Sequence, residues 1–127
     1  MNLSTPITTQ AASSAQLLGA ELTEREAMGV ATMFALLGDP TRVRLLAALA
    51  GAPAGECRVG ELAQAAGRDE STVSHQLRLL RDHGLVQFRR AGRLVYYRLA
   101  DAHVLDLFRQ ALAHAAHSPA LSVREVS

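Results

Sequence analysis

Glycine and aspartate residues divide the chain into short segments. Glycines follow four stretches that have helical spacing, and each can end a helix: Gly38, Gly51, Gly67 and Gly84. Asp39 and Asp69 stand where a carboxylate caps the following helix, and Pro40 takes a first helical position, where its missing N–H does no harm. These interruptions predict several short helices in one small domain.

The spacing of apolar residues predicts five helices and one hairpin. The expected helices cover residues 24–37, 40–51, 59–66, 70–83 and 102–117. Two strand-like runs, 85–90 and 93–99, are joined by Ala91-Gly92 and predict a β-hairpin. The stripe expected to face the core in the second helix is Val43, Leu46, Ala47, Leu49 and Ala50, and in the fourth it is Val73, Leu77 and Leu80. The predicted fold is mainly α with a β-hairpin wing, a winged helix-turn-helix.

Composition excludes several classes of protein. The single cysteine, Cys57, rules out an intramolecular disulfide framework and predicts a reducing compartment, the cytoplasm. No apolar run is long enough to span a membrane, and the first twenty residues do not have the form of a signal peptide. All 13 basic residues are arginine, a residue suited to bidentate contacts with phosphate and guanine.

The fourth helix and the hairpin predict an interface with double-stranded DNA. With the apolar stripe turned inward, small hydrogen-bonding side chains face outward: Ser71, Thr72, Ser74, His75, Gln76 and Arg78. Such a face suits the major groove, with its first residues against base edges. Arg89, Arg90 and Arg93 lie near the hairpin tip, where a wing reaches the DNA backbone or minor groove. The alternative is that these polar residues are only a solvated helix face and that the arginines only keep the protein soluble.

The last helix carries a candidate metal site. His114 and His117 are neighbours on one face, and His103 shares that face because eleven residues make close to three turns. Asp101, expected as the N-cap, can turn its carboxylate towards His103. These ligands suit Zn²⁺ most, with Co²⁺ or Ni²⁺ as alternatives. The alternative to a metal site is that these are simply polar residues on an exposed helix.

Distance determines how these ligands would meet. Eleven helical residues span about 16 Å, whereas zinc ligands lie about 2.0–2.2 Å from the ion. Two antiparallel copies of the helix, paired across a dimer axis, would bring Asp101 and His103 of one chain to His114 and His117 of the other. The sequence therefore predicts a homodimer formed through terminal helices. The expected organisation is a mobile arm over 1–20, a DNA-binding and dimerisation domain over 21–118, and a tail over 119–127.

The sequence resembles the ArsR/SmtB family of metal-responsive repressors from about Leu36 to His117. The likeness rests on LLGDPTRVRLLAAL, VGELA, STVSHQLRLLRDHGLV, GRLVYYRL and the DxHx10HxxH pattern. It implies a dimer of winged helices that represses an operon and releases operator DNA on binding metal, with Asp101, His103, His114 and His117 as ligands. A second family site uses cysteines, but Arg58 and Gly60 stand in those places and Cys57 is displaced by one.

Two other functions fit parts of the sequence. One is a winged-helix regulator without metal that answers to oxidation of Cys57 or to a partner protein. The other is a small metallohydrolase, which needs an open metal position and a nearby base. The last helix has no glutamate, so we expect no enzyme and no organic small-molecule substrate.

Overall fold

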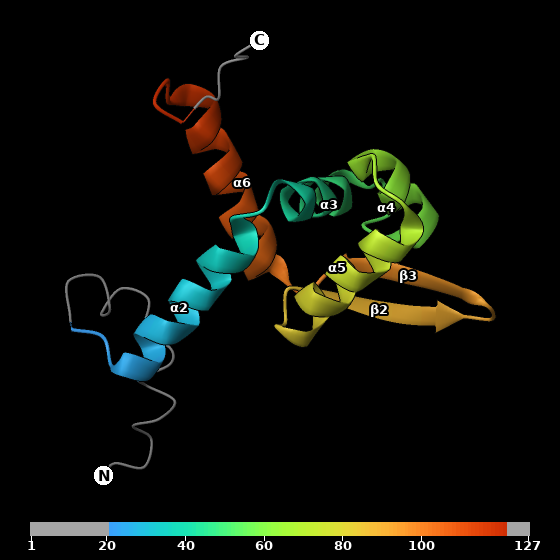
Figure 1. Cartoon of the computed structure of the whole chain (residues 1–127), viewed down its shortest axis with the longest axis horizontal. Coiled ribbons are helices and arrows are strands. Elements are labelled where there is room, and N and C mark those ends of the chain that lie inside the picture. The colour runs from blue at the N-terminus through green and yellow to red at the C-terminus, as the bar shows by residue number, and fades with distance from the viewer. Residues whose placement is uncertain (1–20, 122–127) are drawn as a thin grey trace. The chain divides into compact units, whose positions relative to one another are not determined.

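The computed structural model describes residues 21–121, which divide at residue 35 into two compact units. The described part of the first unit is residues 21–35, most of helix α2 (Glu24–Leu37). The second unit begins at Leu36 and holds the remaining elements: α3 (Pro40–Gly51), β1 (Cys57–Arg58), α4 (Val59–Ala66), α5 (Glu70–Asp82), β2 (Val86–Ala91), β3 (Leu94–Leu99) and α6 (Ala102–His117) (Figure 1). The arm expected over 1–20 and most of the tail lie outside the described residues.

Helix α2 begins with a capping box. The Thr23 amide donates to the Glu26 carboxylate at 2.8 Å, and the Glu26 amide donates to the Thr23 hydroxyl at 3.1 Å. Every side chain from 21 to 35 is exposed in the chain as described, including the apolar Met28 and Phe34. No apolar face of this segment is therefore buried within its own unit.

The expected N-caps form at the starts of three later helices. The Asp39 carboxylate accepts from the Arg42 amide at 3.0 Å, Asp69 does the same for Thr72 at 3.0 Å, and Asp101 for Val104 at 3.1 Å. Each carboxylate satisfies a backbone donor that lacks a partner within its helix. The five helices begin as predicted, and α5 ends at Asp82, one residue earlier than expected.

The core of the second unit gathers around α3, which packs against α4, β3 and α6. Its fully buried side chains come from α3, α4, α5 and β2: Leu45, Leu46, Leu49, Leu62, Val73, Leu77, Leu80 and Val86. The three positions predicted for α5 are confirmed. In α3, Leu45 is buried and Ala47 is exposed, so the predicted stripe was partly wrong. Because α3 is covered from several sides, its buried face is wider than the stripe of a surface helix.

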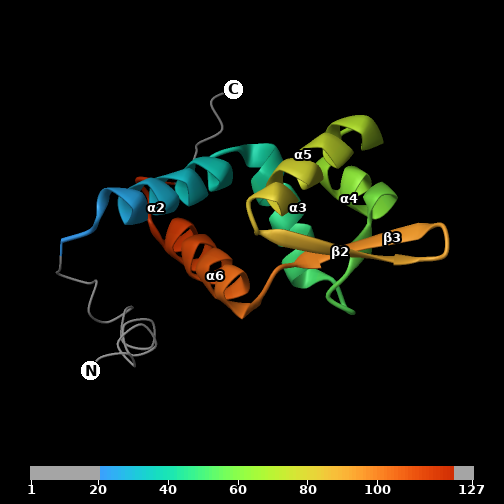
Figure 2. The same ribbon diagram turned by 90° about the horizontal axis from the view of Figure 1, so that it is seen from below.

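The sheet has three antiparallel strands in the order β1-β3-β2. In the hairpin, Ala91 pairs with Leu94, so the turn is Gly92-Arg93, one residue later than expected. Gly92 has φ +65°, a conformation that side chains with a Cβ rarely adopt. The hairpin extends past α4 and α5 in two perpendicular views (Figures 1 and 2). Strand β1, which pairs Cys57 with Tyr97, was not predicted.

The helices found between residues 21 and 121 lack the length and hydropathy that a membrane crossing requires.

Candidate nucleic-acid interface and metal-ligand helix

Helix α5 presents the predicted polar face. Val73, Leu77 and Leu80 are fully buried against the core, which turns the opposite side of the helix outward. Of the six predicted contact residues, Ser71, His75 and Arg78 are exposed, whereas Thr72, Ser74 and Gln76 are half-buried at the flanks. The exposed side chains therefore form the centre of the candidate interface.

The first turn of α5 is held by its N-cap. The Asp69 carboxylate accepts from the Thr72 hydroxyl at 2.6 Å as well as from the Thr72 amide. These hydrogen bonds, the hydroxyl one above all, lower the pKa of Asp69. Because the Thr72 hydroxyl hydrogen is already donated, this side chain can offer DNA an acceptor but not a donor.

The amide of Gln76 is also engaged. Its Oε1 accepts a hydrogen bond from Nη1 of Arg42, on α3, at 2.9 Å. The same guanidinium donates through Nε to the carbonyl of Leu36 at 2.7 Å. Arg42 and Gln76 lie 34 positions apart in the sequence, and no local pattern indicates their contact, so sequence reasoning missed Arg42.

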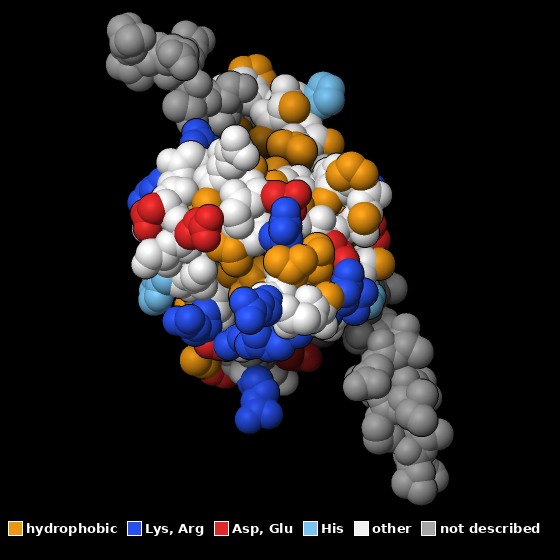
Figure 3. Space-filling view, turned by 90° about the vertical axis from the view of Figure 1, so that its right-hand side faces the viewer, with side chains coloured by type: hydrophobic (Ala, Val, Ile, Leu, Met, Phe, Trp, Pro, Cys, Tyr) orange, Lys and Arg blue, Asp and Glu red, His pale blue; other side chains and the backbone are white. Residues whose placement is uncertain are grey.

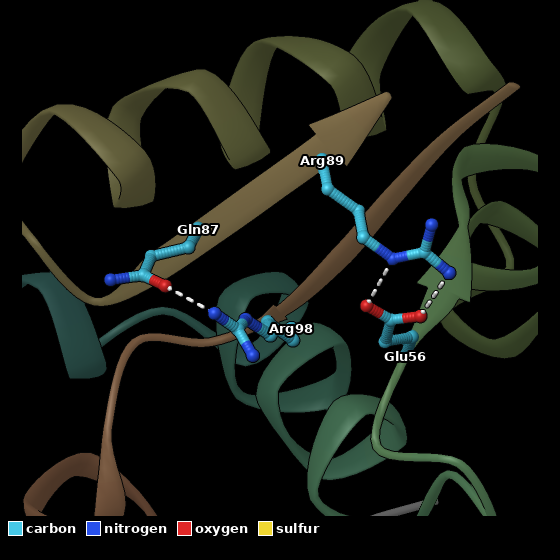
Figure 4. Close-up of polar contacts among 4 residues, drawn as sticks. All are labelled: Glu56, Gln87, Arg89 and Arg98. Carbon is cyan, nitrogen blue, oxygen red and sulfur yellow. Dashed lines mark hydrogen bonds and ion pairs between the residues drawn. The ribbon is translucent and has the colours of Figure 1, made fainter. Parts of the chain in front are cut away.

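The three predicted wing arginines have different surroundings. Arg89 donates twice to the Glu56 carboxylate, at 2.8 and 2.9 Å (Figure 4). Its guanidinium also lies 4.6 Å from the centre of the Tyr96 ring. The hydrogen bond from Arg89 lowers the pKa of Glu56, and the same bond raises the pKa of Arg89. Arg89 therefore has a counter-charge within the chain, and Glu56 is a residue that the sequence did not single out.

Arg90 and Arg93 complete the basic tip of the hairpin. The Arg90 guanidinium lies 5.6 Å from the centre of the Phe88 ring, and Arg93 occupies the exposed turn. Viewed from the hairpin side of Figure 1, arginine side chains gather on the lower part of the surface (Figure 3). Within the wing, Gln87 and Arg98 form a further hydrogen bond of 3.1 Å, between neighbouring strands (Figure 4).

The four candidate metal ligands lie at the two ends of α6. His103 is 97% exposed, and its Nδ1 lies 3.5 Å from Oδ1 of Asp101. His114 and His117 are exposed one turn apart at the other end. Among residues 21–121, no group of three or more histidine, cysteine, aspartate or glutamate side chains comes together to hold a metal ion. The two pairs of candidate ligands therefore do not meet within one chain as described.

The ring of His117 has a defined orientation. Its Nδ1 lies 2.8 Å from the carbonyl oxygen of Ala113. A carbonyl oxygen can only accept, so Nδ1 carries the hydrogen and, in the neutral ring, Nε2 keeps its lone pair. A backbone carbonyl often orients the non-ligating nitrogen of a metal-binding histidine. His83 makes the same contact with the Leu79 carbonyl at 2.9 Å, so the contact identifies Nε2 as the available nitrogen of His117 and does not by itself mark a ligand.

Cys57 lies half-buried on β1, with Sγ 3.9 Å from the carbonyl oxygen of Ala48. Burial raises the pKa of the Cys57 thiol, and the nearby Glu61 carboxylate raises it further. Since the thiolate is the form that binds metals and reacts with oxidants, this environment disfavours both roles.

A helix-turn-helix followed by a basic β-hairpin defines a winged-helix DNA-binding regulator. Residues 39–87 match the family model described as bacterial regulatory protein, arsR family. The chain is 49% identical to the transcriptional repressor SmtB homolog of Synechocystis over 70% of this chain and 65% of that protein. It is 42% identical to the regulator NmtR of Mycobacterium tuberculosis, over 77% of this chain and 79% of that one. The chain belongs to the ArsR family of transcriptional regulators.

Solved structures agree with this assignment. The antimony-specific transcriptional repressor AntR has a TM-score of 0.67 at 35% identity, covering 80% of this chain and 90% of that one. The solution structure of apo-NmtR has a TM-score of 0.66 at 41% identity, covering 85% and 89%. A homodimeric winged helix-turn-helix DNA-binding domain of Mycobacterium bovis has a TM-score of 0.67 at 31% identity, covering 84% and 98%. The chain is thus a DNA-binding regulator rather than a hydrolase.

Proposed function

We propose that this chain is a homodimeric repressor that releases its operator when a transition metal binds across the dimer at α6. Asp101 and His103 of one protomer and His114 and His117 of its partner form each site. One carboxylate and three imidazoles suit Zn²⁺ most, with Co²⁺ or Ni²⁺ as alternatives. The observation that carries this proposal is that α6 is one continuous helix with the two pairs of candidate ligands at its opposite ends.

Exposed apolar side chains support a dimer through the terminal helices. Phe34 on α2 is 58% exposed, Met28 is 60% exposed, and Leu112 on α6 is 55% exposed. Beside Leu112, a cavity of about 200 Å³ is lined almost entirely by apolar side chains: Leu37, Val43, Phe108, Ala111, Leu112 and Ala115. A second copy would bury these surfaces, in keeping with the homodimeric relative.

The connection between wing and ligand helix offers a route from metal to DNA. Only Ala100 and Asp101 separate the last residue of β3 from the first of α6, and the Ala100 amide donates to the Leu85 carbonyl at 3.0 Å. A bound metal would supply attraction between the ligand pairs of the two chains. Any shift of Asp101 towards the partner must then move the end of β3. Release follows only if the metal favours one arrangement of the dimer over the other.

The end of α5, the proposed recognition helix, offers a second link between the metal and the DNA. His83 follows α5 and places Nδ1 2.9 Å from the Leu79 carbonyl oxygen. The resemblance to the ArsR/SmtB family implies a hydrogen bond between a ligand histidine and the backbone near this point, and we propose the backbone of His83 and Gly84 as its partner. The DNA surface comprises the polar face of α5 and the wing arginines: Ser71, Thr72, Ser74, His75, Gln76, Arg78, Arg89, Arg90 and Arg93.

The relatives support a metal as the signal. One, 38% identical over 76% of its length, is a cadmium resistance transcriptional regulatory protein CadC homolog of Staphylococcus aureus, and the structural relative AntR is antimony-specific. Our choice of metal rests instead on the oxygen and nitrogen ligands of α6.

Heterodimers test the shared site. One chain carries Asp101→Asn and His103→Ala, the other His114→Ala and His117→Ala; asparagine keeps an oxygen for the Val104 amide. Each parent homodimer should dimerise and bind DNA but bind no Zn²⁺ at α6. The heterodimer should regain one site, because all four ligands then survive on one side of the interface. A heterodimer that binds no Zn²⁺, although both parents fold and dimerise, contradicts the shared site.

Single variants test the response itself. His103→Ala and His117→Ala should each bind an operator duplex as the wild type does, yet fail to release it when Zn²⁺, Co²⁺ or Ni²⁺ is added. Fluorescence anisotropy with and without each metal measures this. Normal release by either variant would show that its histidine is not a ligand.

A further inference from the structure

The recognition helix α5 contacts the rest of its unit in two different ways, through apolar packing on one side and through a hydrogen bond at its flank. Its apolar side packs against α4 and β2 through Val73, Leu77 and Leu80. Gln76 lies at the flank of that apolar side, half-buried, and contacts α3 through the Arg42 guanidinium. The contact with Arg42 ties one flank of α5 to α3, so a shift of that flank away from α3 would break it.

Arg42 joins three segments of the second unit. Its backbone amide donates to the cap Asp39, its Nε to the Leu36 carbonyl at the end of α2, and its Nη1 to Gln76 on α5. Both side-chain bonds have a charged donor, and such bonds are shorter and stronger than neutral ones. The side chain is part-buried, where solvent competes less for its donors.

The chemistry of the contact also sets the orientation of the Gln76 amide. A guanidinium has donors and no acceptor, so only the oxygen of the amide can face it. Reading adenine with both amide atoms requires that same oxygen as an acceptor. Arg42 takes one of the two lone pairs of that oxygen and fixes the direction of the amide, so Gln76 anchors the helix at the edge of the DNA surface.

We propose that Arg42 is a positioning residue for operator reading: it anchors α5 to the junction of α2 and α3 through Gln76. Discrimination between operator and other DNA then depends on an arginine that contacts no base. This inference rests on the proposed role of α5 in operator binding.

The test compares two duplexes of equal length. The first is selected by the wild-type dimer from a randomised duplex library, and the second is a scrambled version of it. The ratio of their Kd values measures discrimination. Arg42→Ala and Gln76→Leu should each lower this ratio about tenfold, the discrimination of one well-made base contact, mainly by weakening binding to the selected duplex. The double variant should lose no more than Arg42→Ala alone, because that variant already lacks the contact with Gln76.

Gln76→Glu separates anchoring from direct reading. Glutamate keeps an oxygen for Arg42 but has no N–H to donate, so the ratio should stay at the wild-type value while both duplexes bind more weakly. Loss of discrimination in Gln76→Glu, together with normal discrimination in Arg42→Ala, would show direct reading and overturn the proposal. Losses that multiply in the double variant would overturn it too.

Arg44→Ala is the matched control. Arg44 is exposed on the same helix, and its removal deletes the same charge; it should leave the ratio unchanged. Circular dichroism confirms folding at the assay temperature, and Gln76→Leu supplies the result if Arg42→Ala does not fold. If the wild type selects no sequence, operator binding and this inference both fail. If it selects one that folded Arg42→Ala discriminates equally well, only this inference fails.

Discussion

Individual residues in this chain act through partners that lie far away in the sequence. Asp69 could be identified as a cap because its partner, Thr72, is three positions away. The partner of Arg89 is Glu56, 33 positions away. A sequence pattern can predict the contact between Asp69 and Thr72, because helical geometry fixes which near neighbours meet. It cannot predict the contact between Arg89 and Glu56, because only the fold brings these two residues together.

The half-buried thiol of Cys57 leads to a prediction about its reactivity. Because burial raises the pKa of this thiol, little thiolate exists near neutral pH, and alkylation by iodoacetamide should be slower than for an unstructured cysteine peptide. The rate should rise only above the pH range of an ordinary thiol. Cys57→Ser should keep the metal response.

Cobalt offers a direct check on the same residue. A site with only oxygen and nitrogen ligands lacks the strong near-ultraviolet band of thiolate-to-metal charge transfer. A band of that kind in the Co²⁺-loaded dimer, absent from Cys57→Ser, would place the cysteine in the site and refute our ligand assignment.

The Asp69 cap makes the first turn of the recognition helix sensitive to acid. Hydrogen bonds from Thr72 lower the pKa of Asp69 in the folded chain, so its contribution to stability is complete at neutral pH. That contribution is lost as the pH falls through the lowered value, where the carboxylate becomes protonated. Asp69→Asn should therefore be less stable than wild type near pH 7, and the difference should shrink in acid.

Urea unfolding at neutral and at acid pH measures this difference in the free energy of unfolding. Asp106→Asn, which changes an exposed carboxylate on α6, controls for the loss of a charge. A difference between wild type and Asp69→Asn that grows in acid would show that the Asp69 carboxylate does not stabilise the helix in its charged form.

At the scale of elements, local signals predicted the helices well and the sheet less well. Asp39, Asp69 and Asp101 mark helix starts through contacts within one turn. Strand β1 has only two residues, and it exists because Cys57 and Arg58 pair with β3. So short a strand has no periodicity of its own. The hairpin turn was misplaced by one residue because Ala91-Gly92 and Gly92-Arg93 both contain the required glycine.

The wing arginines should contribute unequally to DNA binding. Arg90→Ala and Arg93→Ala should weaken binding to all duplexes alike and lower the slope of log K against log salt by about one for each phosphate that the variant no longer binds. Arg89→Ala should have a smaller effect, because its guanidinium is bound to Glu56. Titrations at several salt concentrations measure the slopes, with Arg109→Ala on α6 as the control. Unchanged slopes for Arg90→Ala and Arg93→Ala would contradict the wing assignment.

For the whole molecule, the proposed metal site depends on association of two chains. Each end of α6 carries only two of the four candidate ligands. The sequence spacing predicts that a second, symmetry-related copy of the helix supplies the other two, and the structure of one chain does not test this. Phe34→Glu should yield a folded monomer, because Phe34 is 58% exposed and lies outside the buried core. That monomer should bind neither Zn²⁺ at α6 nor operator DNA with wild-type affinity.

Sedimentation equilibrium measures the state of association, and circular dichroism measures helix content. Arg25→Glu, on the same helix, should remain dimeric because a charged side chain already occupies that exposed position. If Phe34→Glu stays dimeric, the α2 surface is not part of the interface.

The ion pair between Arg89 and Glu56 has a consequence for the search along a chromosome. The carboxylate occupies two of the five N–H donors of the Arg89 guanidinium, so it competes with a phosphate for this side chain. If Arg89 binds phosphate as proposed, a duplex that offers only its backbone has to displace the Glu56 carboxylate, and an operator would offset that cost with base contacts. Since a genome presents about 10⁶–10⁹ competing sites, we expect this internal carboxylate to shorten the time that the wing spends on DNA other than the operator.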